Sequence, residues 1–415
     1  MARHETEPRN STPQAADAAR FAADVEEGRR HPGGVSHRLL CGVALSWSLF
    51  QIWYASPLPF ALNFGVFNDA EARVIHLAFA LPLAFAAFPA FRSSPRDRVP
   101  AGDWLLAALG VCAALYLLVF RDDLAGRAGA PIGLDLAVGA IGLVVLLEAT
   151  RRAVGPPLVI VAIVFLVYSL AGPWMPDTLA HKGVSFARLV SHQWLGSEGV
   201  FGVAIGVSAG FVFLFVLFGA MLEQAGAGSY FIRLAYSLLG HMRGGPAKAA
   251  VAASGLSGMV SGSSIANVVT TGTFTIPLMT RVGFRAEKAG AIEVAASTNG
   301  QLTPPIMGAA AFLMVEYVNI PYIEVVKHAF LPAVISYIAL LYIVHLESLK
   351  LGLKGLKKPG RHIGVVMIMI LFLTGFFAMA ALTMLVIGFR AMLEPMMPGA
   401  TIYPALVLLA VAYFV

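Results

Sequence analysis

The sequence predicts an all-α polytopic membrane protein with about ten transmembrane helices and one re-entrant helical hairpin. Of its 415 residues, 58% are hydrophobic and 13% are charged, and the mean hydropathy is +0.77. A soluble domain of average usage carries about 25% charged residues. Apolar runs of roughly 20 residues, the length that spans a bilayer, recur along the chain. One further apolar stretch has a length and a polar centre that suit a hairpin rather than a span.

The chain opens with a polar segment, residues 1–38, which is predicted to be cytoplasmic and to contain a short amphipathic helix. No signal peptide is predicted, because the first apolar run is already long enough to span a membrane. Tryptophan residues fall near the ends of the early runs, as expected at a membrane interface. The predicted spans lie at residues 39–59, 74–91, 103–120, 132–149, 156–174, 199–222, 289–315, 324–346, 363–388 and from 402 onward.

The basic residues indicate how these spans are oriented. They are scattered through short loops, so the net charge of +6 does not indicate a nucleic-acid partner. With a cytoplasmic N-terminus and a hairpin that does not cross, most of the 29 Lys and Arg residues face the cytoplasm, in accord with the positive-inside rule. Those predicted outside are Arg73, Arg121, Arg127, Lys182, Arg188, Lys327 and Arg390. Cys41 and Cys112 lie in apolar runs, so neither a disulfide nor a metal site is predicted.

The predicted re-entrant hairpin covers residues 249–280. This apolar stretch is closed by Lys248 in front and Arg281 behind. About thirty residues are too many for one spanning helix and too few for two spans and a turn. The centre, SGSSIAN at residues 261–267, is polar and rich in weak helix formers. Such residues at bilayer depth require partners in protein or water, so we expect a buried polar tip.

The next apolar segment, residues 289–315, is predicted to be a broken helix. Its middle reads STNGQLTPP at residues 297–305. Proline removes a backbone donor and clashes with the preceding turn, so the helix should unwind at mid-depth. Unwound carbonyls and side-chain oxygens are hard ligands that suit a small cation such as Na⁺, and half-helix N-termini attract an anionic substrate. Two consecutive broken segments therefore predict a binding site.

Simpler interpretations of the same residues stay open. Ser254, Gly258 and Gly262 recur every fourth residue, a pattern that also serves close helix packing. The prolines of the second segment also suit a simple kink. Glu293 is an acid inside a predicted span, where acids are generally functional, but its nearness to Lys288 also fits a snorkelling or paired residue.

A different class of function would be an intramembrane hydrolase with Ser263 or Ser264 as its nucleophile. That reaction needs a general base close to the serine. The histidines of this part of the chain lie in a predicted loop or near span ends. The sequence therefore favours transport over hydrolysis, and we do not predict an enzyme.

Residues 202–353 resemble the large membrane subunit of tripartite ATP-independent periplasmic (TRAP) transporters, in the branch that works with TAXI-type binding proteins. The resemblance extends over about 150 residues in one register, which makes it specific. The segments that carry it are GVSAGFVFLFVLFGAMLEQAGAG (206–228), RGGPAKAAVAASGLSGMVSGSSIANVVTTGTFTIPLM (243–279), GAIEVAASTNGQLTPPIMGAAAFLM (290–314) and VHLESLKLGL (344–353).

The resemblance implies an elevator-type secondary transporter in the bacterial inner membrane. A periplasmic binding protein of TAXI type would deliver an organic acid, and a gradient, usually of Na⁺, would drive its uptake. No cofactor is expected, and Na⁺ is the expected coupling ion. The implied domains are a cytoplasmic segment (1–38), a four-helix domain similar to a fused small subunit (39–152) and the N-terminal half of the large subunit (153–415). The four-helix domain matches by arrangement alone.

The resemblance also implies which residues bind ion and substrate: Ser261, Gly262, Ser263, Ser264, Asn267, Thr271, Thr298, Asn299, Gly300, Gln301, Pro304 and Pro305. The implied Na⁺ ligands among them are Ser263, Asn267, Thr298 and Asn299. The family's transport domain is an inverted repeat, and the sequence contains only its first half. We therefore expect a truncated chain, with the second repeat supplied by another polypeptide or, alternatively, a non-transporting remnant or scaffold.

Overall fold

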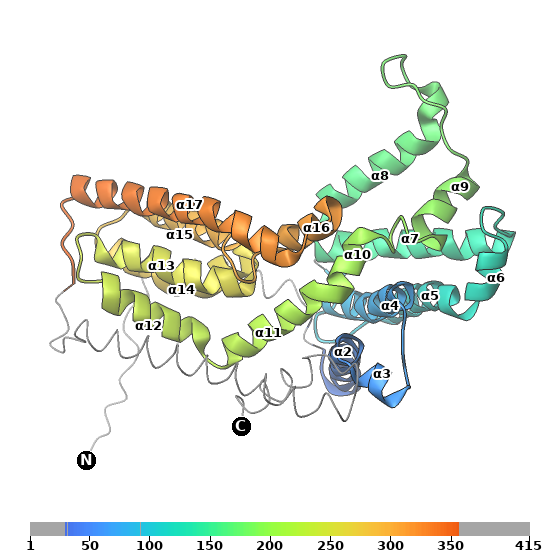
Figure 1. Cartoon of the computed structure of the whole chain (residues 1–415), viewed down its shortest axis with the longest axis horizontal. Coiled ribbons are helices and arrows are strands. Elements are labelled where there is room, and N and C mark those ends of the chain that lie inside the picture. Colours follow the sequence, from blue (N-terminus) through green and yellow to red (C-terminus); the bar gives the residue numbers. More distant parts are fainter. Residues whose placement is uncertain (1–29, 31, 92, 357–415) are drawn as a thin grey trace. The chain divides into compact units, whose positions relative to one another are not determined.

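The computed structural model describes residues 30, 32–91 and 93–356, and these ranges contain helices and loops but no strand (Figure 1). The predicted amphipathic N-terminal helix and the predicted spans at 363–388 and after 402 lie outside the described residues. The chain divides into two units, one formed by residues 1–45 and 69–357 and the other by residues 46–68 and 358–415. An all-α membrane protein is confirmed.

The described part of the second unit contains the end of α2 (Gly34–Ala55) and the short helix α3 (Leu58–Leu62). Asn63 ends α3 in the left-handed conformation, with a φ of 51°. The indole nitrogen of Trp53 donates to the carbonyl oxygen of Gly65 over 3.1 Å, which ties the helix end to the following loop. This is the loop between the first two predicted spans.

In the first unit, an N-terminal group of helices packs around one apolar core. Leu81, Phe85 and Trp194 are fully or almost fully buried in it. The Trp194 indole nitrogen donates to the carbonyl of Ala113 over 3.1 Å. The elements are α4 (Asp69–Ala87), α5 (Ala101–Val119), α6 (Arg121–Gly126), α7 (Gly133–Ala153), α8 (Pro156–Ala171), η1 (Gly172–Trp174), α9 (Phe186–Val190) and η2 (Ser191–Leu195).

One end of this helix group is held by buried and half-buried ion pairs. Asp103 at the start of α5 pairs with Arg30 over 2.6 Å and with Arg152 at the end of α7 over 2.8 Å. Glu148 pairs with Arg152 and Arg151, each over 2.7 Å. A buried charge is costly without a partner, so these pairs explain how five ionisable groups are accommodated beside apolar helices.

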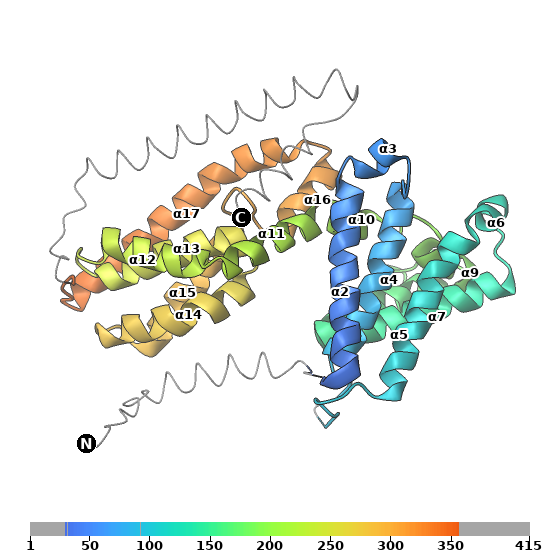
Figure 2. The same ribbon diagram turned by 90° about the horizontal axis from the view of Figure 1, so that it is seen from below.

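The same unit continues with a second group of helices. Figures 1 and 2 show α13, α14 and α15 side by side, with α12 and α17 packed on them. Val251, Met279, Ala296 and Val344 form their buried core. The elements are α10 (Val203–Val207), η3 (Ser208–Val212), α11 (Phe213–Gln224), α12 (Ala227–Leu239), α13 (Gly245–Ser261), α14 (Ser264–Arg281), α15 (Ala286–Gly300), α16 (Ala309–Val318) and α17 (Tyr322–Lys350).

Six helical segments among the described residues are long and apolar enough to cross a membrane. They are Asp69–Ala87, Ala101–Val119, Gly133–Ala153, Pro156–Trp174, Val203–Leu222 and Tyr322–Lys350. Each overlaps a predicted span. The predicted span at 39–59 corresponds to α2, which is not among the six, and the predicted span at 289–315 is divided between α15 and α16. The chain is therefore a multi-pass membrane protein, while the total of about ten spans stays a prediction.

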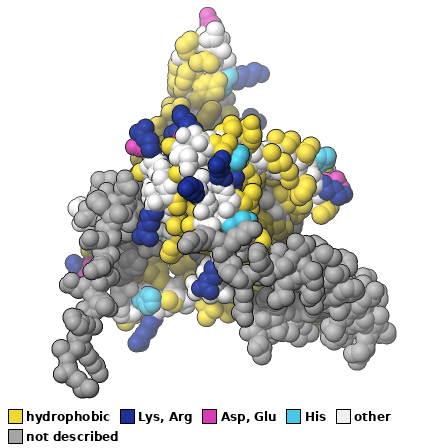
Figure 3. All heavy atoms as spheres, turned by 90° about the vertical axis from the view of Figure 1, so that its left-hand side faces the viewer, with side chains coloured by type: hydrophobic (Ala, Val, Ile, Leu, Met, Phe, Trp, Pro, Cys, Tyr) yellow, Lys and Arg dark blue, Asp and Glu magenta, His cyan; other side chains and the backbone are white. Residues whose placement is uncertain are grey.

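Lys and Arg side chains gather at one end of the second helix group (Figure 3). Helix α13 begins at this end, α14 ends there, α15 begins there and α17 ends there. The basic residues of these helix ends and their connections include Arg243, Lys248, Arg281, Arg285, Lys288 and Lys350. A basic end is what the positive-inside rule predicts for the cytoplasmic feet of the hairpin, and the orientation stays a prediction.

Candidate functional site

The tip of the hairpin is the turn between α13 and α14. Gly262 follows α13 with a φ of 63°, in the left-handed region that favours glycine. The hydroxyl of Ser263 accepts from the backbone N–H of Ala266 over 3.3 Å and so caps α14. A Cβ atom at Gly262 would lie 2.5 Å from the carbonyl oxygen of Met307. The tip therefore touches the segment that follows α15.

That segment, residues 301–308, is the break between α15 and α16. It contains Pro304 and Pro305, joined by a cis peptide bond. The N–H groups of Gln301, Leu302 and Thr303 donate to the carbonyls three residues earlier over 3.0–3.1 Å. These bonds tighten the end of α15, as is common where a helix terminates. The predicted break is present.

The expected extent of the unwound region was wrong. Thr298, Asn299 and Gly300 belong to the last turn of α15 and are helical. Their carbonyls each accept one of the three bonds from the break. The helix continues because Pro304 disfavours helix at its own position and just before it, and Thr298 to Gly300 lie more than one residue earlier.

Two small residues let the hairpin and α15 approach closely. A Cβ atom at Gly300 would lie 2.7 Å from the Cα of Gly258. The hairpin tip also binds the break directly, since Gln301 Nε2 donates to the hydroxyl of Ser264 over 3.2 Å. Gly258 thus serves close packing, and the polar contact joins two residues predicted to lie in one site.

We expect Gln301→Leu to lower the initial uptake rate about three- to tenfold, because it removes one neutral hydrogen bond worth about 1 kcal/mol between tip and break. The measurement is uptake by the reconstituted transporter. Leu302→Ala changes the adjacent, half-exposed residue and serves as the control. A rate for Gln301→Leu equal to that of the control would show that the contact has no role in transport.

A buried polar cluster fills the interface of α13, α14 and α15. Asn267 Nδ2 donates to the backbone carbonyl of Ser254 and to the Ser297 hydroxyl, each over 2.9 Å. Because a carbonyl can only accept, the amide nitrogen must face it. Asn267 is fully buried, and its Oδ1 has no hydrogen-bond partner in the described part of the chain. A free acceptor is therefore left inside the cluster.

Glu293 lies at the centre of this cluster and is fully buried. Thr271 and Thr275 of α14 donate their hydroxyls to its two carboxyl oxygens over 2.5 and 2.7 Å. Ser297, one turn further along α15, lies 3.4 Å from it. Among the described residues Glu293 has no ion pair, and Lys288 pairs with Glu347 instead. The interpretation of Glu293 as a snorkelling or lysine-paired residue was wrong.

The structure brings together only part of the predicted site. Asn267 and Thr271 lie in the buried cluster. The tip serines lie in the turn between α13 and α14, and Gln301 lies just after α15. The side chain of Thr298 is exposed and donates to the carbonyl of Val294 over 2.8 Å. Because α15 remains helical, Thr298 points away from Asn267, and the four implied Na⁺ ligands do not form one set.

The cluster also contains residues that sequence reasoning did not select: Ser254, Thr275, Glu293 and Ser297. Spacing of four residues could have found Thr275, Glu293 and Ser297. Asn267, Thr271 and Thr275 recur at this spacing on α14, and Glu293 and Ser297 do so on α15. Residues four apart share one helix face, so each series predicts a polar stripe facing its neighbour.

A cavity of about 530 Å³ lies beside the hairpin, between α11 and α12 on one side and α13 and α14 on the other. Two predicted site residues, Ser261 and Thr271, contribute to its lining. Arg233 of α12 and the hydroxyl-bearing residues Ser257 and Thr270 line it too. The predicted site thus borders a space of the size that small-molecule ligands occupy.

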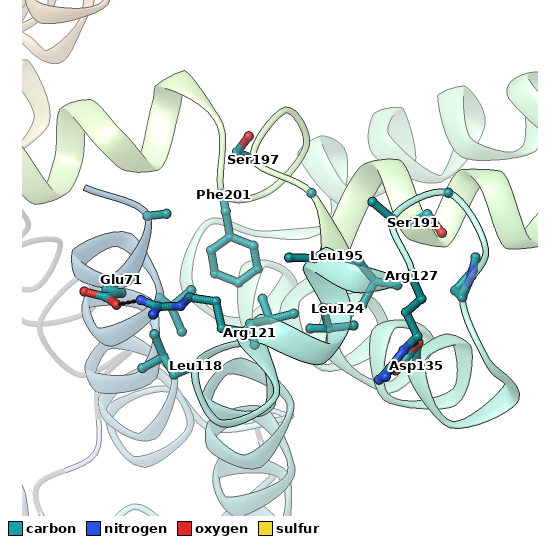
Figure 4. Close-up of a pocket in the computed structure, with 18 residues that line it drawn as sticks. Glu71, Leu118, Arg121, Leu124, Arg127, Asp135, Ser191, Leu195, Ser197 and Phe201 are labelled. Atoms are coloured by element: carbon teal, nitrogen blue, oxygen red, sulfur yellow. Dashed lines mark hydrogen bonds and ion pairs between the residues drawn. The ribbon is translucent and has the colours of Figure 1, made fainter. Parts of the chain in front are cut away.

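A second cavity, of about 430 Å³, lies among the N-terminal helices and contains none of the predicted site residues (Figure 4). Its charged side chains are already paired with each other. Arg121 pairs with Glu71, and Arg127 binds Asp135 through two hydrogen bonds of 2.8 and 2.9 Å. Since such internal pairs satisfy both charges, we assign no ligand to this cavity.

The contacts of the hairpin serines give no support to an intramembrane hydrolase. Ser263 caps α14 and Ser264 accepts from Gln301. In the described residues neither hydroxyl contacts a histidine or a carboxylate. His345 instead lies 3.0 Å from the amine of Lys248, at the opposite end of α13. A serine nucleophile would lack the adjacent base that activates it.

Comparison with known proteins places the chain in a family. Residues 141–415 match the family model described as "Tripartite ATP-independent periplasmic transporter, DctM component". Over 91 residues the chain is 35%, 40% and 36% identical to proteins named C4-dicarboxylate TRAP transporter large permease protein DctM, from Rhodobacter capsulatus, Pseudomonas aeruginosa and Vibrio cholerae respectively. These matches cover 22% of this chain and about a fifth of each relative (20–21%).

No solved structure matches the chain. The family match covers more than half of the 415 residues and includes the hairpin, the break and the buried cluster. It confirms the resemblance to the large membrane subunit of TRAP transporters. The chain belongs to the DctM-component family of tripartite ATP-independent periplasmic transporters.

Proposed function

We propose that the chain is the membrane permease component of a tripartite uptake system. In this proposal a periplasmic binding protein of TAXI type delivers an organic acid, and Na⁺ entry drives its secondary active transport across the bacterial inner membrane. The family match supports the permease role. The relatives are named for C4-dicarboxylates, which are one candidate class of organic acid.

The observation that carries the proposal is the buried polar cluster between hairpin and broken helix. Asn267 Oδ1 has no partner, and the Glu293 carboxyl has no cationic partner among the described residues. Leaving such groups unpaired in a buried site is costly. A small cation held by these oxygens would satisfy both, and hard oxygen ligands suit Na⁺. The donor set present therefore fits a coupling ion.

The proposed architecture follows the sequence. Residues 1–38 would be a cytoplasmic segment, residues 39–152 a scaffold similar to a fused small subunit, and residues 153–415 the first half of the large subunit. An elevator-type movement would carry the re-entrant hairpin at 249–280 and the broken helix at 289–315 together. Close packing at Gly258 and the bond between Gln301 and Ser264 support movement of these elements as one body.

We expect Asn267→Leu to raise the Na⁺ concentration that gives half-maximal uptake at least about tenfold. The variant removes the free oxygen, and one lost ligand to a charged group costs about 1.5–3 kcal/mol. The measurement is the Na⁺ dependence of organic acid uptake in proteoliposomes supplied with the binding protein. Val269→Leu, a half-buried apolar change two residues along α14, is the matched control. An unchanged Na⁺ dependence would remove the cluster from the coupling mechanism.

A further inference from the structure

The cavity between the α11–α12 pair and the hairpin has one cationic group. Arg233, on α12, contributes to its lining, and no acidic residue does among the side chains that the structure describes. Its guanidinium is exposed and makes no ion pair with any described side chain. Arg30, Arg73, Arg127, Arg151 and Arg152, by contrast, all bind carboxylates within the described ranges. Arg233 is therefore free to bind an anion in this space.

The rest of the lining is apolar with a few hydroxyl groups. Val216, Phe231, Val260 and Phe274 provide apolar surface. Ser257 lies in the same lining and makes no hydrogen bond to a described residue. A guanidinium, a hydroxyl and apolar walls match a molecule with one carboxylate on an apolar body, since a few placed polar groups orient a ligand in an otherwise apolar pocket.

We propose that this cavity binds the organic acid during transport and that it selects a monocarboxylate with a branched or aromatic body. The inference rests on the proposed transport function and adds the substrate class to it. Arg233 would hold the carboxylate through charge-assisted hydrogen bonds. A dicarboxylate would place its second charge against apolar walls, where no cation is available among the lining residues. Ser261 and Thr271 would bring the bound acid next to the tip and the buried cluster.

An exposed arginine on an amphipathic helix has a simpler role, which is to reach the lipid headgroups. Arg243 offers the matched comparison for this role. It is also exposed and lies in the connection between α12 and α13, but it does not line the cavity. Removing the charge of Arg233 or of Arg243 should weaken binding to lipid headgroups to a similar extent. Only removal of the Arg233 charge should weaken binding of a ligand in the cavity.

The test is equilibrium binding of radiolabelled isovalerate, phenylacetate and succinate to the full chain in lipid nanodiscs. We expect saturable binding of the two monocarboxylates and weaker binding of succinate. Arg233→Gln should weaken monocarboxylate binding at least about tenfold, the effect of losing a charged hydrogen-bond partner. Arg233→Lys should weaken it less, and Arg243→Gln should leave it unchanged. Ala220→Phe, which fills the cavity from α11, should weaken phenylacetate binding more than isovalerate binding.

Three binding results would overturn the proposal: monocarboxylate binding that is absent or unaffected by Arg233→Gln, binding of succinate that is tighter than that of the monocarboxylates, and displacement of the probes by small amounts of palmitate. The last would mean that the cavity takes a fatty acid from the membrane. Uptake of any organic acid by the unmodified transporter with its binding protein is measured in parallel. Uptake that persists in Arg233→Gln would overturn this inference alone, whereas no uptake by the unmodified protein would contradict the proposed function itself.

Discussion

Replacement of Glu293 by glutamine is expected to reduce the initial rate of organic acid uptake to below about 1% of the unmodified rate. Two threonine hydroxyls donate to the Glu293 carboxyl inside the buried cluster. Glutamine has nearly the same shape but lacks the charge, and hydrogen bonds to charged groups are worth about 1.5–3 kcal/mol each. Loss of the negative charge, which no other described residue of the cluster supplies, would remove cation binding. Uptake into proteoliposomes at saturating Na⁺ measures this effect.

Glu287→Gln is the matched control, because Glu287 lies on the same helix but is exposed and pairs with Arg285 at the surface. An exposed pair contributes little, so this variant should keep at least about half of the rate. Both variants should insert into membranes in equal amounts. Normal uptake by Glu293→Gln would mean that the carboxyl serves packing alone.

Gly300→Val is expected to destabilise the fold by about 3 kcal/mol and to lower uptake at least about tenfold, since overpacking a close contact costs 1–3 kcal/mol or more. A Cβ at this position would meet the backbone of Gly258 at 2.7 Å, and a backbone atom cannot move aside as a flexible side chain can. The α15 helix would have to separate from α13. Thermal unfolding of the purified protein in detergent measures the destabilisation.

Gly290→Ala provides the control within the same helix. A Cβ at Gly290 would meet nothing within 4 Å, so alanine should stabilise α15 by about 0.5–1 kcal/mol through its higher helix propensity. We expect the unfolding temperature to fall in Gly300→Val and to rise in Gly290→Ala. A rise for both would show that α13 and α15 do not rely on the small residues at positions 258 and 300.

The main elements of this region could be predicted from sequence because their signals are local. A polar turn in an apolar stretch predicted the hairpin, and Pro304 and Pro305 predicted the break. Apolar run lengths predicted spans that overlap the six candidates among the described residues. Each prediction follows from what lipid or helix geometry excludes at a given residue, so no knowledge of distant contacts was needed.

The composition of the site depended on contacts that sequence position does not reveal. The nearness of Glu293 to Lys288 in sequence suggested a pair, but Lys288 pairs with Glu347 of α17. Thr298 looked like part of an unwound ligand set, yet α15 stays helical beyond it and exposes its side chain. Which face of α15 meets the hairpin is set by packing at Gly258 and Gly300. Such packing decides which polar residues meet.

Na⁺-coupled transport by this permease can be tested directly. The decisive measurement is accumulation of a radiolabelled organic acid in proteoliposomes that contain the protein, with the loaded binding protein outside and an imposed Na⁺ gradient. We predict accumulation only with an inward Na⁺ gradient and only when the binding protein is present. Equal accumulation after choline replaces Na⁺ would contradict Na⁺ coupling through the buried cluster, and accumulation without the binding protein would contradict the tripartite mechanism.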